Sequence, residues 1–166
     1  MKLSNVVKCA LPAAMLGLVA LGLTPTSAFA STATANMAVT ATVQTDCTIT
    51  TGSMAFGTYT GAAASTTATL TVTCTNTTPY NVGLNPGATS GATVTTRQML
   101  NGTATLNYGL YTNATWTTNW GNTTGSWVAG TGNGTAQTLT VYGQIPAAQF
   151  VTPGSYTDTV VATVNY

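Results

Sequence analysis

The sequence predicts an all-β protein, folded as a β-sandwich. Several short stretches alternate apolar and polar residues, which is the pattern of a strand with one buried face. Threonine, a β-branched residue that favours strands, fills most of the polar positions. Glycine, proline and asparagine interrupt the stretches at short intervals, and no stretch has the periodicity of a useful helix. Several short strands in one small domain are typical of a sandwich.

Residues 1–30 are predicted to be an export signal. Lys2 and Lys8 supply the positive start, and residues 10–23 form an apolar run that is shorter than the roughly 20 residues a membrane span needs. Residues 28–30 read Ala-Phe-Ala, a small-x-small cleavage pattern. The mature protein is therefore expected to begin near residue 31 in an exported compartment.

The first predicted strand follows the signal at once, over residues 36–45. Its alternation is strict, so one face is apolar and the other is mostly polar. Such a strand can pair with its own sheet or complete the sheet of a neighbouring molecule, and the pattern alone leaves both open. The apolar positions are Met37, Val39, Ala41 and Val43.

The other strands follow in chain order, with a tight turn at Asn101-Gly102 marking a hairpin. Residues 113–134 are the least regular part and are expected to hold loops and a short strand. The last strand, 155–166, carries Val160, Ala162, Val164 and Tyr166 on one face. The predicted strands are 45–49, 66–75, 80–84, 97–100, 105–111, 135–145 and 155–166.

Cys47 and Cys74 are the two cysteines that follow the signal, and an even pair in an exported protein predicts a disulfide. The chain-entropy model assigns a bridge over a loop of this length roughly 3–4 kcal/mol. A metal site is disfavoured, because two thiols in a chain without histidine are too few ligands. No cofactor is expected.

Charge is scarce, since only 3% of the residues are charged. After residue 30 the charged side chains are Asp46, Arg97 and Asp158, and one arginine cannot form a nucleic-acid-binding patch. The chain has no histidine and two acids, so an acid–base or nucleophilic site has almost nothing to be built from. We therefore expect no enzyme and no nucleic-acid partner.

Two further features have a structural and a functional interpretation. Asp158 lies on the same strand face as Val160, and an aspartate near a strand start more often accepts turn or backbone hydrogen bonds. Trp116, Trp120 and Trp127 could form a platform for sugar rings, but tryptophans in sandwiches more often pack in the core or under loops.

A family resemblance rests on three C-terminal segments, 141–146, 153–160 and 164–166, and on three middle segments, 106–112, 120–121 and 130–135. With these segments nearly all of the mature chain resembles the spore coat protein U domain family, which includes pilins of archaic chaperone–usher pili. Cys47 and Cys74 match the paired cysteines of that family. Gly154 and Tyr166 are 12 positions apart, similar to the glycine-to-aromatic spacing that pilus chaperones recognise.

This resemblance implies an immunoglobulin-like sandwich that lacks its last strand. A periplasmic chaperone strand would fill the gap first, and the N-terminal extension of another copy or a related pilin would replace it at an outer-membrane usher. On that interpretation residues 31–45 are the donor extension, with the four apolar positions as plugs, and 46–166 are the pilin domain. Val160, Ala162, Val164, Tyr166 and Gly154 would then form the acceptor cleft and dock the chaperone.

The expected function is a structural subunit of a surface pilus that supports adhesion and biofilm formation. Two alternatives remain at this point. One is a self-contained exported coat protein with residues 36–45 in its own sheet, and the other is a carbohydrate-binding surface protein.

Overall fold

The computed structural model describes residues 30–166, and the predicted export signal lies outside that part except for Ala30. These residues contain strands and no helix, so the all-β prediction is confirmed. The strands, in chain order, are β1 (Cys47–Thr51), β2 (Ala64–Cys74), β3 (Pro79–Leu84), β4 (Arg97–Asn101), β5 (Ala104–Tyr111), β6 (Val128–Thr131), β7 (Ala136–Ile145) and β8 (Ala162–Asn165).

The strands form two antiparallel sheets, one of five strands in the order β1-β2-β7-β5-β4 and one of three in the order β6-β3-β8. The inward residues of both sheets meet in one core, which makes the fold a sandwich. Val72, Val141 and Ile145 come from the larger sheet, whereas Val82 and Leu84 come from the smaller one. Each alternates with polar residues on its strand, as the sequence pattern predicts.

The predicted hairpin is present between β4 and β5. Asn101 pairs with Ala104, and Gly102 in the turn has a φ of 59°, a left-handed conformation that glycine adopts without strain. The irregular region contains one short strand, β6, which pairs with β3. Both features agree with the sequence.

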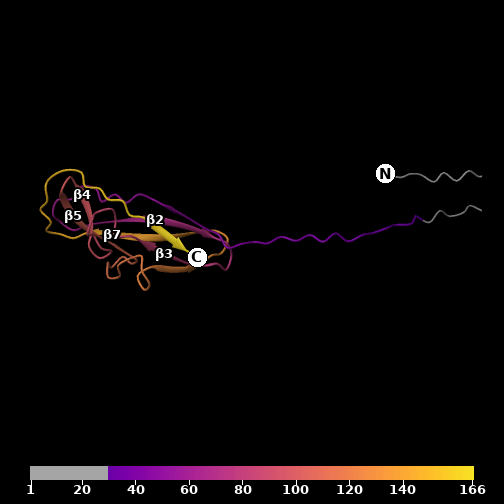
Figure 1. Cartoon of the computed structure of the whole chain (residues 1–166). Coiled ribbons are helices and arrows are strands. Elements are labelled where there is room, and N and C mark those ends of the chain that lie inside the picture. The colour runs from indigo at the N-terminus through magenta and orange to yellow at the C-terminus, as the bar shows by residue number, and fades with distance from the viewer. Residues whose placement is uncertain (1–29) are drawn as a thin grey trace, which may run out of the picture. The chain divides into compact units, whose positions relative to one another are not determined.

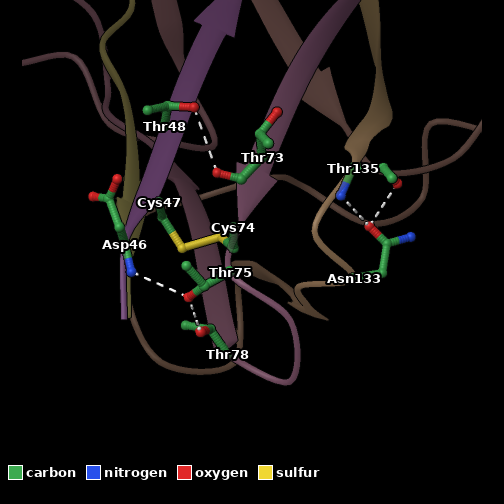
Figure 2. The surroundings of a disulfide bond; sticks show 9 residues. All are labelled: Asp46, Cys47, Thr48, Thr73, Cys74, Thr75, Thr78, Asn133 and Thr135. Atoms are coloured by element: carbon green, nitrogen blue, oxygen red, sulfur yellow. Dashed lines mark hydrogen bonds between the residues drawn. A yellow bond between two sulfur atoms is a disulfide. The ribbon is translucent and has the colours of Figure 1, made fainter. Parts of the chain in front are cut away.

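The predicted disulfide is also present. It joins Cys47 and Cys74, which face each other in the β1–β2 register (Figure 2). Beside it, the Asp46 amide donates to the Thr75 hydroxyl over 3.2 Å, and the Thr75 and Thr78 hydroxyls are 2.6 Å apart. The bridge therefore fixes the start of β1 to the end of β2, directly after the N-terminal extension.

The last strand is shorter than predicted. The pattern indicated 155–166, but only Ala162–Asn165 pairs with β3. β3 ends at Leu84. The next residue, Asn85, donates its amide to the Val161 carbonyl oxygen at 3.0 Å and accepts the Val161 amide on its side-chain oxygen, rather than its carbonyl, at 2.8 Å. Further back, Thr157 exchanges two backbone hydrogen bonds with Leu100 of β4. Between residues 156 and 161 half-buried and exposed residues still alternate, as the sequence pattern indicated. These residues nevertheless form no regular hydrogen-bonded ladder with β3.

Candidate functional site

The sandwich is open along one edge. β8 is the last strand of the smaller sheet and β1 is the first of the larger one, and the two lie against each other across the layers. In the part of the chain that the structure describes, β8 pairs with β3 alone. Its other edge is therefore free to pair with an added strand.

A groove runs along this open edge. Its first part has a volume of about 410 Å³ and lies between residues 51–56 on one side and 156–162 on the other. Apolar side chains dominate its lining, because the floor is the core face of the larger sheet. The floor includes Leu70, Leu110 and Val141, and the walls include Met54, Phe56, Val160 and Ala162.

A second part, with a volume of about 760 Å³, continues the groove toward residues 57–61 and 149–155. Met54, Phe56, Met99 and Tyr156 line both parts, so the two lie next to each other. The 54–56 wall packs closely because Gly143 below it has no side chain. A Cβ there would lie 2.9 Å from the Phe56 ring. Residues 54–56 are not among the site residues that the sequence predicts.

Asp158 joins the groove wall to the rest of the domain. Its carboxylate accepts hydrogen bonds from the Ala88 amide at 2.8 Å, the Thr159 amide at 2.7 Å and the Tyr108 hydroxyl at 2.6 Å. Burial, and then the hydrogen bond to Asp158, raises the pKa of Tyr108 above its usual range, so the phenol remains a donor. The interpretation of Asp158 as an acceptor of backbone hydrogen bonds is thus confirmed.

Arg97 holds the end of β3, a role that sequence reasoning missed. The side chain is fully buried, and its guanidinium donates to the carbonyl oxygens of Leu84, Asn85, Val94 and Trp120 at 2.7–2.9 Å. Burial lowers the pKa of Arg97, while Tyr108 and Asp158 favour its charged form. The signal in the sequence is that Arg97 is the single cation after residue 30 and begins a predicted strand.

Only some of the predicted acceptor residues line the groove. Val160 and Ala162 line the first part of the groove, and Gly154 lines the second. A side chain at Gly154 would meet the Asn101 amide, and its φ of 154° also disfavours other residues. Val164 packs against the core, and Tyr166 is 58% exposed and lines neither part. The sequence pattern did not distinguish the residues that line the groove from those that do not.

The predicted plug residues lie on an extended stretch, 30–46, which has no assigned strand (Figure 1). Met37, Val39 and Val43 are 86%, 85% and 86% exposed, and Ala41 is exposed as well. None of these residues belongs to either sheet. The segment thus presents an apolar stripe to solvent.

The three tryptophans do not form a common platform. Trp120 is 1% exposed and donates its indole N–H to the Val82 carbonyl oxygen at 2.8 Å, so it belongs to the core. Trp127 is half-buried, and Trp116 is exposed in a loop. The packing interpretation therefore holds for Trp120.

The described residues hold no group of three potential metal ligands. Within them there is also no helix with the length and apolarity that crossing a membrane requires.

The fold and its groove define an immunoglobulin-like sandwich that is open along the β8 edge. The model of the Spore Coat Protein U domain family matches residues 33–163, so the chain belongs to that family.

Known proteins that are similar to it include a curated relative and a solved pilus subunit complex. Protein U of Myxococcus xanthus is 43% identical over 86 residues, which make up 51% of this chain and 48% of that protein. The chain thus spans about half the length of this curated relative. A chain in the solved CsuC–CsuE chaperone–tip adhesion subunit pre-assembly complex, from the archaic chaperone-usher Csu pili of Acinetobacter baumannii, has the same fold. It aligns with a TM-score of 0.58 and 23% identity over 75% of this chain and 41% of that chain.

Proposed function

We propose that this protein is a structural subunit of a surface pilus, assembled through the chaperone–usher pathway by donor-strand exchange. The observation that carries the proposal is the combination of an open apolar groove beside β8 and an exposed apolar stripe on residues 37–43. The family and the Csu pilus fold support the same function. Adhesion and biofilm formation would be the roles of the assembled fibre.

The physical basis is β-strand addition. An incoming strand satisfies the free backbone groups of β8, and its alternate side chains enter the groove. Burial of a large aliphatic side chain contributes about 1.5–3 kcal/mol, so Met37, Val39 and Val43 together could hold a long-lived joint. Ala41 contributes less, since it is small.

The joint is head-to-tail, because the extension of one copy enters the groove of the next. Such a contact does not close on itself and generates an open filament. Before assembly the groove would need a temporary strand, which we assign to a periplasmic chaperone that docks along residues 154–166. An outer-membrane usher would then exchange that strand for the extension of another copy or of a related pilin at the cell surface.

The direct test places one charge on each face of the donor strand. Val39→Asp puts a carboxylate into the groove, whereas Thr40→Asp, the matched control, puts it on the opposite face. We expect Val39→Asp to lower the yield and heat resistance of polymers on unboiled gels, and Thr40→Asp to leave both near the wild-type level. Equal behaviour of the two variants would contradict the assigned faces.

Deletion of residues 31–44 distinguishes a polymerising subunit from a self-contained coat protein. A subunit without its donor should accumulate in the periplasm as a folded complex with a chaperone and form no polymer. A stable monomer free of any chaperone would favour the coat protein.

A further inference from the structure

The outer face of the five-stranded sheet carries polar but uncharged side chains. Arg97 and Asp158 lie at the core and the groove, and Asp46 precedes β1, so no charged residue points outward from β1, β2 or β7. The outward residues of β2 and β7 are mainly threonines, paired in register, as Thr69 with Thr140. This face is the opposite side of the sheet from the groove.

Two tyrosines lie next to each other on this face. Tyr111 of β5 pairs with Tyr142 of β7, and both are half-buried. The outer end of the Tyr111 ring occupies the space that a side chain at Gly109 would take, so the ring lies along the strand on the sheet. A tyrosine that covers a strand glycine in this way is held in place and leaves one side of its ring to solvent.

Hydrogen-bonding groups surround the two rings. Thr67 pairs with Tyr142, and Gln144 lies between Ser65 and Gly109 in the register. Within residues 30–166, the side chains of Ser65, Thr67, Tyr111, Tyr142 and Gln144 take part in no hydrogen bond to protein atoms. Their hydroxyl and amide groups are thus available to a ligand.

We propose that this face binds a neutral polysaccharide, with sugar rings against Tyr111 and Tyr142. A pyranose ring has an apolar face that packs on an aromatic ring, and its hydroxyls exchange hydrogen bonds with side chains such as Thr67 and Gln144. An anionic polymer is disfavoured because the face has no cation to pair with it. Protein interface cores are also rich in tyrosine and poor in charge, so a protein contact is the competing outcome of the test below.

The site goes beyond the proposed assembly function and does not depend on it. On β7, Val141 lines the groove and Gly143 packs beneath its wall, while Tyr142 and Gln144 face the other way. Substitutions of Tyr142 should therefore leave the donor joint unchanged. Polymer ladders on unboiled gels measure that joint separately.

The test measures retention of the mature full-length protein, as purified from the cell surface, on microcrystalline cellulose and on cross-linked dextran. We expect wild-type protein to bind at least one of the two, with little change in 0.5 M NaCl. Tyr142→Ser should weaken binding about tenfold, and Tyr142→Phe, which keeps the ring, should retain most of it. Trp116→Asn removes an exposed aromatic ring from the loop that follows β5, outside the strands of this face, and is the matched control, expected to bind like wild type.

If Tyr142→Ser fails to fold, Thr67→Val keeps the β-branched shape and removes one hydroxyl, for an expected loss of about threefold. Wild-type protein that binds neither matrix would overturn the proposal. The proposal would also be overturned if Trp116→Asn abolishes binding, or if the Tyr142 and Thr67 variants leave binding unchanged. Loss of binding in salt would overturn it as well. A Tyr142→Ser effect on association between copies, without any binding to the matrices, would assign the face to a protein contact instead.

Discussion

Replacement of Arg97 by methionine should destabilise the domain more than any single plug substitution. Methionine has a similar length and leaves only a small cavity, so the main change is the loss of the hydrogen bonds to Leu84, Asn85, Val94 and Trp120. A buried acceptor left without a donor costs about 1–3 kcal/mol. Four such carbonyls give roughly 4–8 kcal/mol when part of the loss is relieved by water or relaxation.

This loss is comparable with the whole stability of a typical domain, about 5–15 kcal/mol. It also acts on the groove, because Leu84 and Asn85 hold β8 and Val161. We therefore expect Arg97→Met to reduce both the folded fraction and the amount of polymer.

The assay is urea unfolding, followed by the fluorescence of the buried Trp120. The protein carries a second copy of residues 36–45 after Tyr166 on a Gly/Ser linker, so that the groove is filled within one molecule. Arg97→Lys is the control, since it keeps the charge but not the fork of donors, and an intermediate loss is expected. If Arg97→Met lowers the free energy of unfolding by less than about 1 kcal/mol, the conclusion that Arg97 stabilises the end of β3 through its hydrogen bonds is refuted.

Three further outcomes are expected. Removing the disulfide by Cys47→Ser with Cys74→Ser should lower the free energy of unfolding by about 3–4 kcal/mol, measured in the same urea assay. The raised pKa of Tyr108 predicts that the free energy of unfolding falls as the pH rises above about 10, because the phenol ionises there in the unfolded chain and not in the folded one. Tyr108→Phe should remove this pH dependence of the urea midpoint. Ala162→Phe should fill the groove and block polymerisation, whereas Val161→Phe, on the exposed face of the same segment, should not. Polymer ladders on unboiled gels compare the two variants. Equal ladders would mean that the groove does not accept the donor strand.

Much of the fold followed from local patterns. Alternation placed β2, β3 and β7 because each strand has one face in the core and one in solvent. Asn101-Gly102 fixed the β4–β5 hairpin through its turn geometry. The pairing of Cys47 with Cys74 needed only a count of the cysteines that follow the predicted export signal.

Long-range contacts escaped the same reasoning. The length of β8 depends on where β3 ends and on the side chain of Asn85, 76 positions away from Val161. The opposite wall of the groove depends on Gly143, which lets Met54 and Phe56 pack closely. The role of Arg97 depends on four carbonyls from three separate segments.

The amino-acid sequence by itself determined that this is an all-β protein with an apolar N-terminal stripe and almost no charge, because composition and alternation act locally. The tertiary structure alone decided that β8 has a free edge over an apolar groove, and which of Val160, Ala162, Val164 and Tyr166 face it. It also put Tyr111 beside Tyr142, since the packing of distant strands sets what each face presents.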